Sequence, residues 1–393
     1  MVKKLALAAL LFFIMLLMSS CWDHMELTNM LFVAGVGLDV DESGGVYRAS
    51  VEIIDIDGDD GKNITSRLVE GEGPTIYEAM QNAMSMTGGI MFSNHCKVVV
   101  IGDALSHKGI NGVIDIVLRS PSLRKTVDIM LAKGTDARSI LTHKTVKSDI
   151  VSFELSKILD SNVRTMNNTV KTSVFRLHEN LLSGCPASVI PTVSVRKNNG
   201  EDFLQIDGAA VFYGDVFRGF LSGEQSKIFR VATNNAERPV ISVRDGRFSE
   251  EKFDISLKKC RVSLRPYFQD GAPALHMDVR VEAGFEGSAV LNADITDKKT
   301  LREIESAAEE QLSRDILLLA EYARSEFGAD IFEFYRTFES RCRLEWPSMK
   351  SEWPVLFNEM DISITSSVRI SGSGLTGNFA PRAWNISDGN VLP

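Results

Sequence analysis

The first part of the chain, residues 30–159, alternates between apolar, β-rich runs and segments whose apolar residues recur every three to four positions. The β-rich runs 30–38 and 46–54 flank an acidic turn that contains glycine, which is typical of a hairpin. The run 97–101 is almost wholly apolar, as in a strand buried on both faces. Strands that alternate with helices predict a mixed α/β sheet domain.

A helix is predicted to begin after Pro74, because Thr75 and Glu78 have the spacing of a capping box and a helical apolar pattern follows. The glycine pair at 88–89 should end it. The same patterns predict the remaining elements of this region: a polar loop over 55–67, a strand over 126–132, and helices over 109–119, 136–141 and 148–159.

The middle of the chain is less regular. Two prolines and the hydrophilic run 196–202 predict a linker over 183–202. Gly214 and Asp215 separate two β-rich runs, 206–213 and 216–221, and this arrangement predicts a second hairpin.

The longest predicted helix covers residues 300–327, with Thr300 and Glu303 as its capping pair and Gly328 as its end. Long strands are predicted before and after it, over 253–267, 274–285 and 360–370. Three aromatic residues between the helix and the last strand are expected to pack in a core: Trp346, Trp353 and Phe357.

The N-terminus has the pattern of a bacterial lipoprotein export signal. Two lysines precede the apolar run 5–18, which is shorter than the roughly 20 residues of a spanning helix, and small residues then lead to Cys21. We expect cleavage before Cys21, whose sulfur would carry the lipid. Met18 departs from the leucine usual in this signal. The alternative is an uncleaved anchor with an incidental cysteine.

These patterns divide the chain into segments, since 393 residues exceed what one core usually serves. We predict a signal peptide (1–20), an N-terminal mixed α/β domain (21–190), a small middle domain or linker with a β-hairpin (191–238), a C-terminal α/β domain (239–371) and a flexible tail (372–393). Residues before 191 could also belong to the middle domain.

The formal net charge of −9 argues against two kinds of partner. Nucleic-acid binding depends on clustered Lys and Arg, and the chain has no basic block. An acidic chain is also not expected to hold an anionic membrane by charge. The lipid on Cys21 must therefore anchor the protein, and stable anchoring requires more than one acyl chain.

Candidate chemistry is sparse. The chain lacks the common hydrolase, zinc-protease, phosphate-loop and dinucleotide motifs, and its histidines are scattered. The acidic run that begins at Asp55 does not fit an EF-hand, because Asp60 stands where the glycine should be. His95 beside Cys96 is read as structural. We therefore expect no catalytic residue, no metal site and no organic cofactor.

Four cysteines remain besides Cys21, at positions 96, 185, 260 and 342. Their number permits two disulfides in an exported protein. Each lies in or beside an apolar segment, where a free thiol behaves as a small hydrophobic group, and this placement favours four free cysteines.

Several segments resemble the C-subunit lipoproteins of spore germinant receptors, the Ger(x)C family. The resemblance begins with Cys21-Trp22-Asp23 and continues with a strand that carries Gly35, Gly37 and Asp39. Further matching segments cover most of the chain: residues 74–83, 93–102, 109–110, 131–134, 208–212, 219–221 and 346–357 with the final strand.

The resemblance implies a non-enzymatic protein of three mixed α/β domains with an unusual fold. It also implies a lipid anchor on the outer face of the spore inner membrane, integral-membrane partners of the A and B type, and a role in nutrient-triggered germination. The family has no catalytic residue, so the resemblance assigns a role to Cys21 alone, as the residue that carries the lipid.

Two other classes of protein stay open. A solute-binding lipoprotein of a membrane transporter would share the anchor and the α/β architecture, but it would show two similar lobes. An envelope hydrolase would need a catalytic site that the sequence does not reveal.

Overall fold

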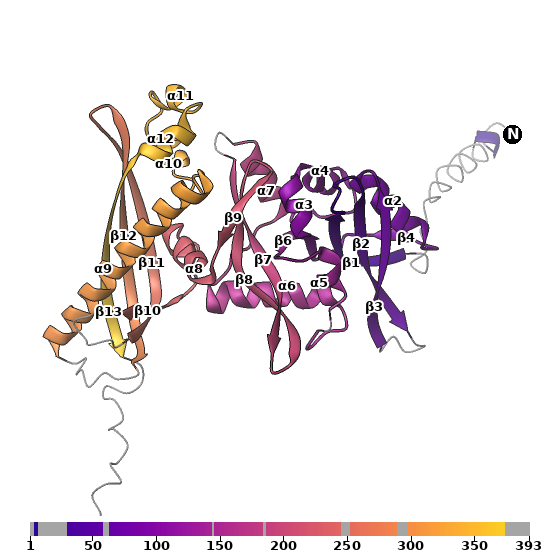
Figure 1. Ribbon diagram of the computed structural model, residues 1–393, viewed down its shortest axis with the longest axis horizontal. Coiled ribbons are helices and arrows are strands. Elements are labelled where there is room, and N and C mark those ends of the chain that lie inside the picture. Colours follow the sequence, from indigo (N-terminus) through magenta and orange to yellow (C-terminus); the bar gives the residue numbers. More distant parts are fainter. Residues whose placement is uncertain are drawn as a thin grey trace, which may run out of the picture.

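The computed structural model describes residues 4–6, 30–57, 63–143, 145–183, 186–244, 252–288 and 297–373, which build two β-sheets with helices packed against them (Figure 1). This arrangement confirms the predicted mixed α/β class. Cys21, most of the predicted signal peptide, Asp59, Asp60, Cys185 and residues 374–393 lie outside the described residues.

The larger sheet has nine strands in the order β3-β2-β1-β5-β6-β7-β8-β9, with β4 paired to β1. Its centre is parallel, from β1 through β5 and β6 to β7, and its flanks are antiparallel. The strands are β1 (Met30–Val40), β2 (Tyr47–Asp57), β3 (Asn63–Gly73), β4 (Ile90–Phe92), β5 (Val98–Ile101), β6 (Asp128–Ala132), β7 (Ala187–Asn198), β8 (Glu201–Tyr213) and β9 (Val216–Leu221).

Helices cover both faces of this sheet (Figure 1). One face carries α2 (Ile76–Ser85), α3 (Asp103–Lys108), α4 (Asn111–Arg119) and α7 (Val174–Leu181). The other carries α5 (Ala137–Leu141) and α6 (Val151–Ser161). Parallel strands need cover on both faces because both are apolar, and the two buried clusters on either side of β5 supply it.

The smaller sheet has four strands in the order β10-β11-β12-β13. The strands are β10 (Val240–Arg244), β11 (Lys252–Gln269), β12 (Ala272–Ser288) and β13 (Asp361–Ser373). The long helix α9 (Lys298–Tyr322) crosses one face of the sheet (Figure 1). Short helices follow it: α10 (Tyr335–Arg341), α11 (Trp346–Met349) and α12 (Trp353–Glu359).

Side chains of α9 also satisfy backbone groups at both edges of the smaller sheet. Glu309 and Glu305 accept hydrogen bonds from the backbone N–H groups of Val368 and Ile370 in β13, each at 2.8 Å. At the opposite edge, Gln311 accepts from the Arg244 N–H at 2.7 Å and donates to the backbone of β10. Unpaired edge groups would otherwise be free to pair with another chain.

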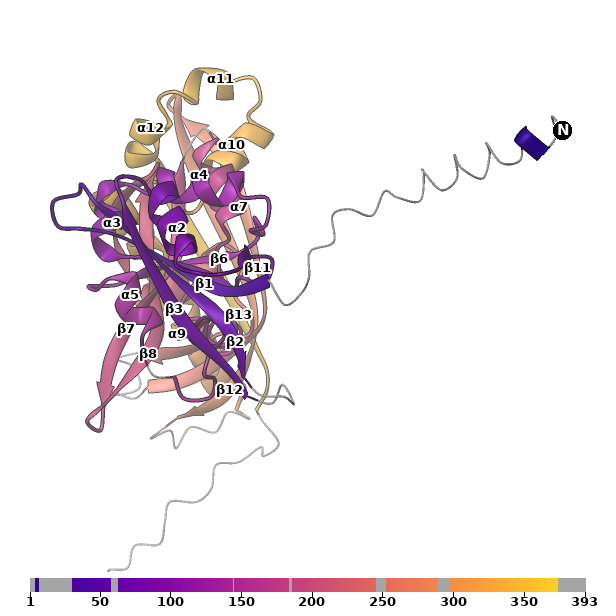
Figure 2. The same cartoon turned by 90° about the vertical axis from the view of Figure 1, so that its right-hand side faces the viewer.

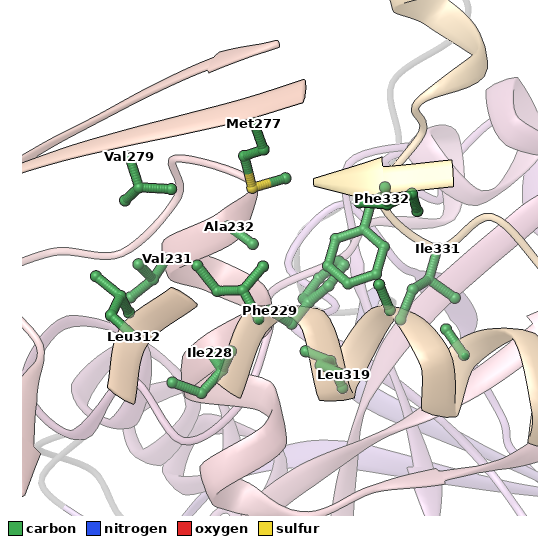
Figure 3. Close-up of a cluster of buried hydrophobic side chains, with 14 of the residues drawn as sticks. Ile228, Phe229, Val231, Ala232, Met277, Val279, Leu312, Leu319, Ile331 and Phe332 are labelled. Atoms are coloured by element: carbon green, nitrogen blue, oxygen red, sulfur yellow. The ribbon is translucent and has the colours of Figure 1, made fainter. Parts of the chain in front are cut away.

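Helix α8 (Gly223–Ala232) lies between the two sheets (Figure 1). Figure 3 shows its apolar residues beside side chains of β12, α9 and the segment after α9: Ile228, Phe229, Val231 and Ala232 with Met277, Val279, Leu312, Leu319, Ile331 and Phe332. The same buried cluster includes Val189 of β7 and Val211 of β8. The two sheets therefore share one apolar core.

Most predicted strands and helices are present, including both hairpins and the long helix. Two loop predictions are wrong. The predicted polar loop 55–67 contains the end of β2 and the start of β3, and the predicted linker 183–202 contains β7. Pro191 is tolerated in β7 because a bulge lies between Pro191 and Val193.

Smaller corrections concern element ends. Asp297, not Thr300, caps α9: its carboxylate accepts the Thr300 N–H at 2.9 Å. Strand β13 runs to Ser373, past the predicted start of the tail. The predicted domain boundary at residue 190 falls inside β7, and the division of the chain into domains stays a prediction.

Candidate functional site

A cleft of about 740 Å³ lies where the two sheets meet. Helix α7 and strand β7 line one side of it, β11 and residues 331–334 line the other, and the end of α8 closes it. Its walls combine apolar side chains such as Val189, Val262 and Phe332 with charged ones. Its volume is in the range typical of small-molecule sites, and it is the candidate site of the described part of the chain.

Asp330 fixes the segment that forms one wall of the cleft. This carboxylate is 1% exposed and accepts the backbone N–H groups of Phe334 and Tyr335 at 3.0 and 2.9 Å. It also accepts the indole N–H of Trp353 at 3.1 Å. Burial raises the pKa of Asp330 to about 6, against the lowering effect of these donors. The segment 331–334 is thus tied to α10 and α12.

Arg230 of α8 is a buried charge in the cleft wall. Its side chain is 4% exposed, and it donates to the carbonyl oxygens of Thr169 at 3.1 Å and Asn235 at 2.6 Å. Among the residues that the structure describes, no carboxylate forms an ion pair with Arg230, and its Nε has no acceptor. Burial lowers the pKa of Arg230. The guanidinium therefore links α8 to two neighbouring segments through neutral acceptors only.

The other two cations of the cleft are paired. Arg176 of α7 donates to both carboxylate oxygens of Glu333, at 2.8 and 2.9 Å, and so bridges the cleft. Lys171 lies 2.6 Å from Asp160 and 3.2 Å from Asp128. The residues that line the cleft include no histidine, cysteine or serine. The arrangement is suited to binding a polar group or to holding the two sheets together.

Sequence reasoning did not single out Arg230 or Asp330. Each is a charged residue inside an otherwise apolar stretch, Ile228 to Val231 and Ala329 to Phe332. A buried charge is costly unless its hydrogen bonds are satisfied. A single charged residue within an apolar run was therefore the sequence signal that could have identified Arg230 and Asp330.

The strand motif Gly35, Gly37 and Asp39 is structural. Asp39 accepts the N–H groups of Ala137 and Arg138 at the start of α5, at 2.7 and 3.1 Å. A Cβ on Gly35 would lie 1.9 Å from the hydroxyl oxygen of Ser152 in α6. The motif thus lets α5 and α6 approach β1 closely.

His95 and Cys96 do not form a thiol–imidazole pair. Cys96 is buried and donates to the Val98 carbonyl at 3.4 Å, whereas His95 is exposed and lies against the rings of Phe32 and Phe92. Burial raises the pKa of Cys96 to about 12, so its thiol is un-ionised at neutral pH. Cys96, Cys260 and Cys342 are free in the structure.

Within the described ranges, no group of three or more His, Cys, Asp or Glu residues is placed to hold a metal ion. Of the methionines in and after α2, Met91 is buried, Met80 and Met84 pack against the core, and Met86 is exposed. Within these ranges, no helix combines the length and apolar character that crossing a membrane requires.

Two family descriptions match the chain. Residues 23–195 match the description "Spore germination protein N-terminal domain", and residues 207–374 match "Spore germination B3/ GerAC like, C-terminal".

Full-length relatives agree with these matches. Spore germination protein KC of Bacillus subtilis (strain 168) is 24% identical, with 96% of this chain and 98% of the relative covered. Spore germination protein B3 of the same organism is 21% identical, over 94% and 98%. The solved structure titled "Crystal Structure of the GerBC protein" has the same fold, with a TM-score of 0.59 at 17% identity over 86% of this chain and 97% of that one.

Proposed function

Because the chain belongs to the Ger(x)C family of spore germination proteins, we propose that it is the lipoprotein subunit of a germinant receptor and acts in nutrient-triggered spore germination. The observation that carries this proposal is the agreement of both halves of the chain with one family, at nearly full length. The export signal before Cys21 adds independent support.

Cys21 is the proposed lipid attachment site, on the outer face of the spore inner membrane. Eight residues separate it from Met30, the first residue of β1. The nine residue steps from Cys21 to Met30 span about 32 Å at most when fully extended. The folded body would therefore stay close to the bilayer, which raises its effective concentration near membrane partners.

The proposed partners are the integral-membrane A and B type subunits of the receptor. We propose a non-enzymatic role in which contacts with these subunits carry the function. Weak contacts suffice for a tethered protein, since its second binding event is effectively intramolecular. We also propose that the protein has three domains. The four-stranded sheet would form the core of the last domain.

The alternative is a solute-binding lipoprotein of a transporter. Such proteins have two similar lobes, whereas the two sheets here have nine and four strands in different orders. The cleft between them keeps a ligand-binding role open for test, and ligand-induced closure in solution scattering would favour that alternative.

The test compares three strains: one with the wild-type gene, one with the gene deleted and one with Cys21→Ala. Deletion should abolish germination in response to one group of nutrients, while germination by routes that bypass receptors persists. The Cys21→Ala protein should be lost from the membrane fraction and should fail to restore germination. Normal nutrient germination without the gene, or a processed Cys21→Ala protein retained in the membrane, would contradict the proposal.

A further inference from the structure

A second hollow, of about 830 Å³, lies on the smaller sheet near β13, away from the cleft. It is lined mainly by charged side chains of β11, β12, β13 and α9. Five of these are cations: Lys259, Arg261, Arg280, Arg302 and Arg369. Three are acids: Glu282, Glu305 and Glu309.

The strand register explains why cations gather there. Arg261 pairs with Arg280 across β11 and β12, and Lys259 and Arg369 flank Glu282 in the next row. Side chains alternate between the two faces of a strand. The neighbours Val279, Val281 and Val368 face the core under α9, and the charged residues between them face outward and are exposed.

The acids of the hollow are already engaged. Glu282 lies 3.0 Å from Lys259. Glu305 and Glu309 accept backbone N–H groups of β13, as described above. Arg280 pairs with Asp278 at 2.7 Å.

Three arginines are left without a carboxylate partner. Arg261, Arg302 and Arg369 form no ion pair with any residue in the described part of the chain. All three are exposed and line the same hollow. In a chain with 52 acidic and 43 basic residues, an ordinary solvated face would supply acids for them. A local excess of unpaired arginine is the arrangement that phosphate groups require, because a guanidinium presents parallel N–H donors to two oxygens.

We propose that this hollow is a binding site for a phosphate group, held by Arg261 and Arg369 on the outward face of the sheet. The phosphate could belong to a lipid headgroup or to a soluble phosphate compound. A lipid as the source of the phosphate depends on the membrane tether in the proposed function. Binding of a phosphate group as such does not depend on it. A headgroup bound here would turn this face of an acidic protein toward the bilayer.

The experiment uses the full chain in neutral detergent at pH 7 and at a constant, low ionic strength. Inorganic phosphate and glycerophosphoglycerol, the headgroup of phosphatidylglycerol without its acyl chains, are titrated separately by calorimetry, with acetate as a singly charged comparison. The double variant Arg261→Gln/Arg369→Gln should bind the phosphate probes at least about tenfold more weakly than wild type. Arg196→Gln, on the distant strand β7, is exposed and should bind like wild type.

Binding of glycerophosphoglycerol that depends on the two arginines would support the site and a lipid source. Binding of inorganic phosphate alone would support the site with a soluble source. The proposal is overturned if neither phosphate probe binds, if acetate binds equally well, or if the double variant binds as wild type does while keeping the same melting temperature. None of these results depends on whether Cys21 carries lipid, so the site and the proposed function fail separately.

Discussion

At the scale of single residues, three buried carboxylates that lie outside helices cap the first N–H groups of helices. Asp39 of β1 accepts N–H groups at the start of α5, and Glu52 of β2 accepts the N–H groups of Val151 and Ser152 in α6, each at 2.8 Å. Asp330 does the same at the start of α10. The first N–H groups of a helix lack partners within it and favour negative charge. These carboxylates therefore position helices as well as stabilise them.

Asp330 should make stability fall as the pH rises. Its pKa is raised from 3.8 to about 6 in the folded protein, so the folded state holds more protons than the unfolded state between those values. The free energy of unfolding of wild type should drop by about 2 kcal/mol relative to Asp330→Asn between pH 4 and pH 7. Urea denaturation of both proteins across this range measures the difference. A difference that is constant, or that rises with pH, would contradict the assignment.

The caps formed by Asp39 and Glu52 could not be predicted from local sequence. Asp39 lies 98 residues from Ala137, and Glu52 lies 99 residues from Val151. The sequence marked Asp39 only through its resemblance to a family motif, and it marked neither Glu52 nor Arg230. A cap within its own helix is different: Thr75 was predicted from spacing and does accept the Glu78 N–H, at 3.1 Å.

At the scale of elements, strands with a clear apolar pattern were predicted, including the edge strands β9 and β13, whereas the polar edge strand β3 was not. Strand β3 is an edge strand with the polar sequence NITSRLVEGEG, so it has little periodic signal. Its partner helix α2 was predicted, and the two pack closely because Gly71 lacks a side chain: a Cβ there would lie 2.2 Å from the backbone nitrogen of Ala83.

Gly71→Ala should therefore destabilise the protein strongly. The clash is with backbone atoms of α2, which cannot move without separating the helix from β3. We expect a loss of at least about 3 kcal/mol in the free energy of unfolding. Gly88→Ala is the matched control, since nothing lies within 4 Å of its Cβ position, and it should change stability by less than about 0.5 kcal/mol. Equal effects in urea denaturation would show that close packing at Gly71 is not required.

At the scale of the whole molecule, the two sheets are joined by a shared core around α8 and by one ion pair across the cleft. The sequence predicted separate units on either side of a linker. The shared core was not predicted, because β7 was read as linker and α8 was missed despite its capping pair Ser222 and Gln225. The cleft is formed by the way in which the two sheets meet, and no local sequence pattern describes that arrangement.

The pair Arg176 and Glu333 should couple the two sheets energetically. Both side chains are partly exposed, so we expect a coupling of about 1 kcal/mol in a double-mutant cycle of the alanine variants. Hydrogen exchange of residues 331–334 should also quicken in Arg176→Ala. The helix pair Arg119 and Asp115 is more exposed and serves as the control, with a coupling below about 0.5 kcal/mol. No coupling across the cleft would mean that the apolar core alone holds the sheets.

The hairpin of β7 and β8 affects the order in which the two sheets can form. β7 pairs with β6 through only two residue pairs, Leu131 with Thr192 and Ala132 with Val193, whereas it pairs with β8 along almost its whole length. If the proposed signal peptide directs the chain across the membrane with its N-terminal part first, β7 is presented before β8, from which only Asn199 and Gly200 separate it. The larger sheet would then close as residue 221 emerges. The smaller sheet needs β13, which lies near the end of the chain. Nearly the whole chain would therefore have to cross the membrane before the smaller sheet could form.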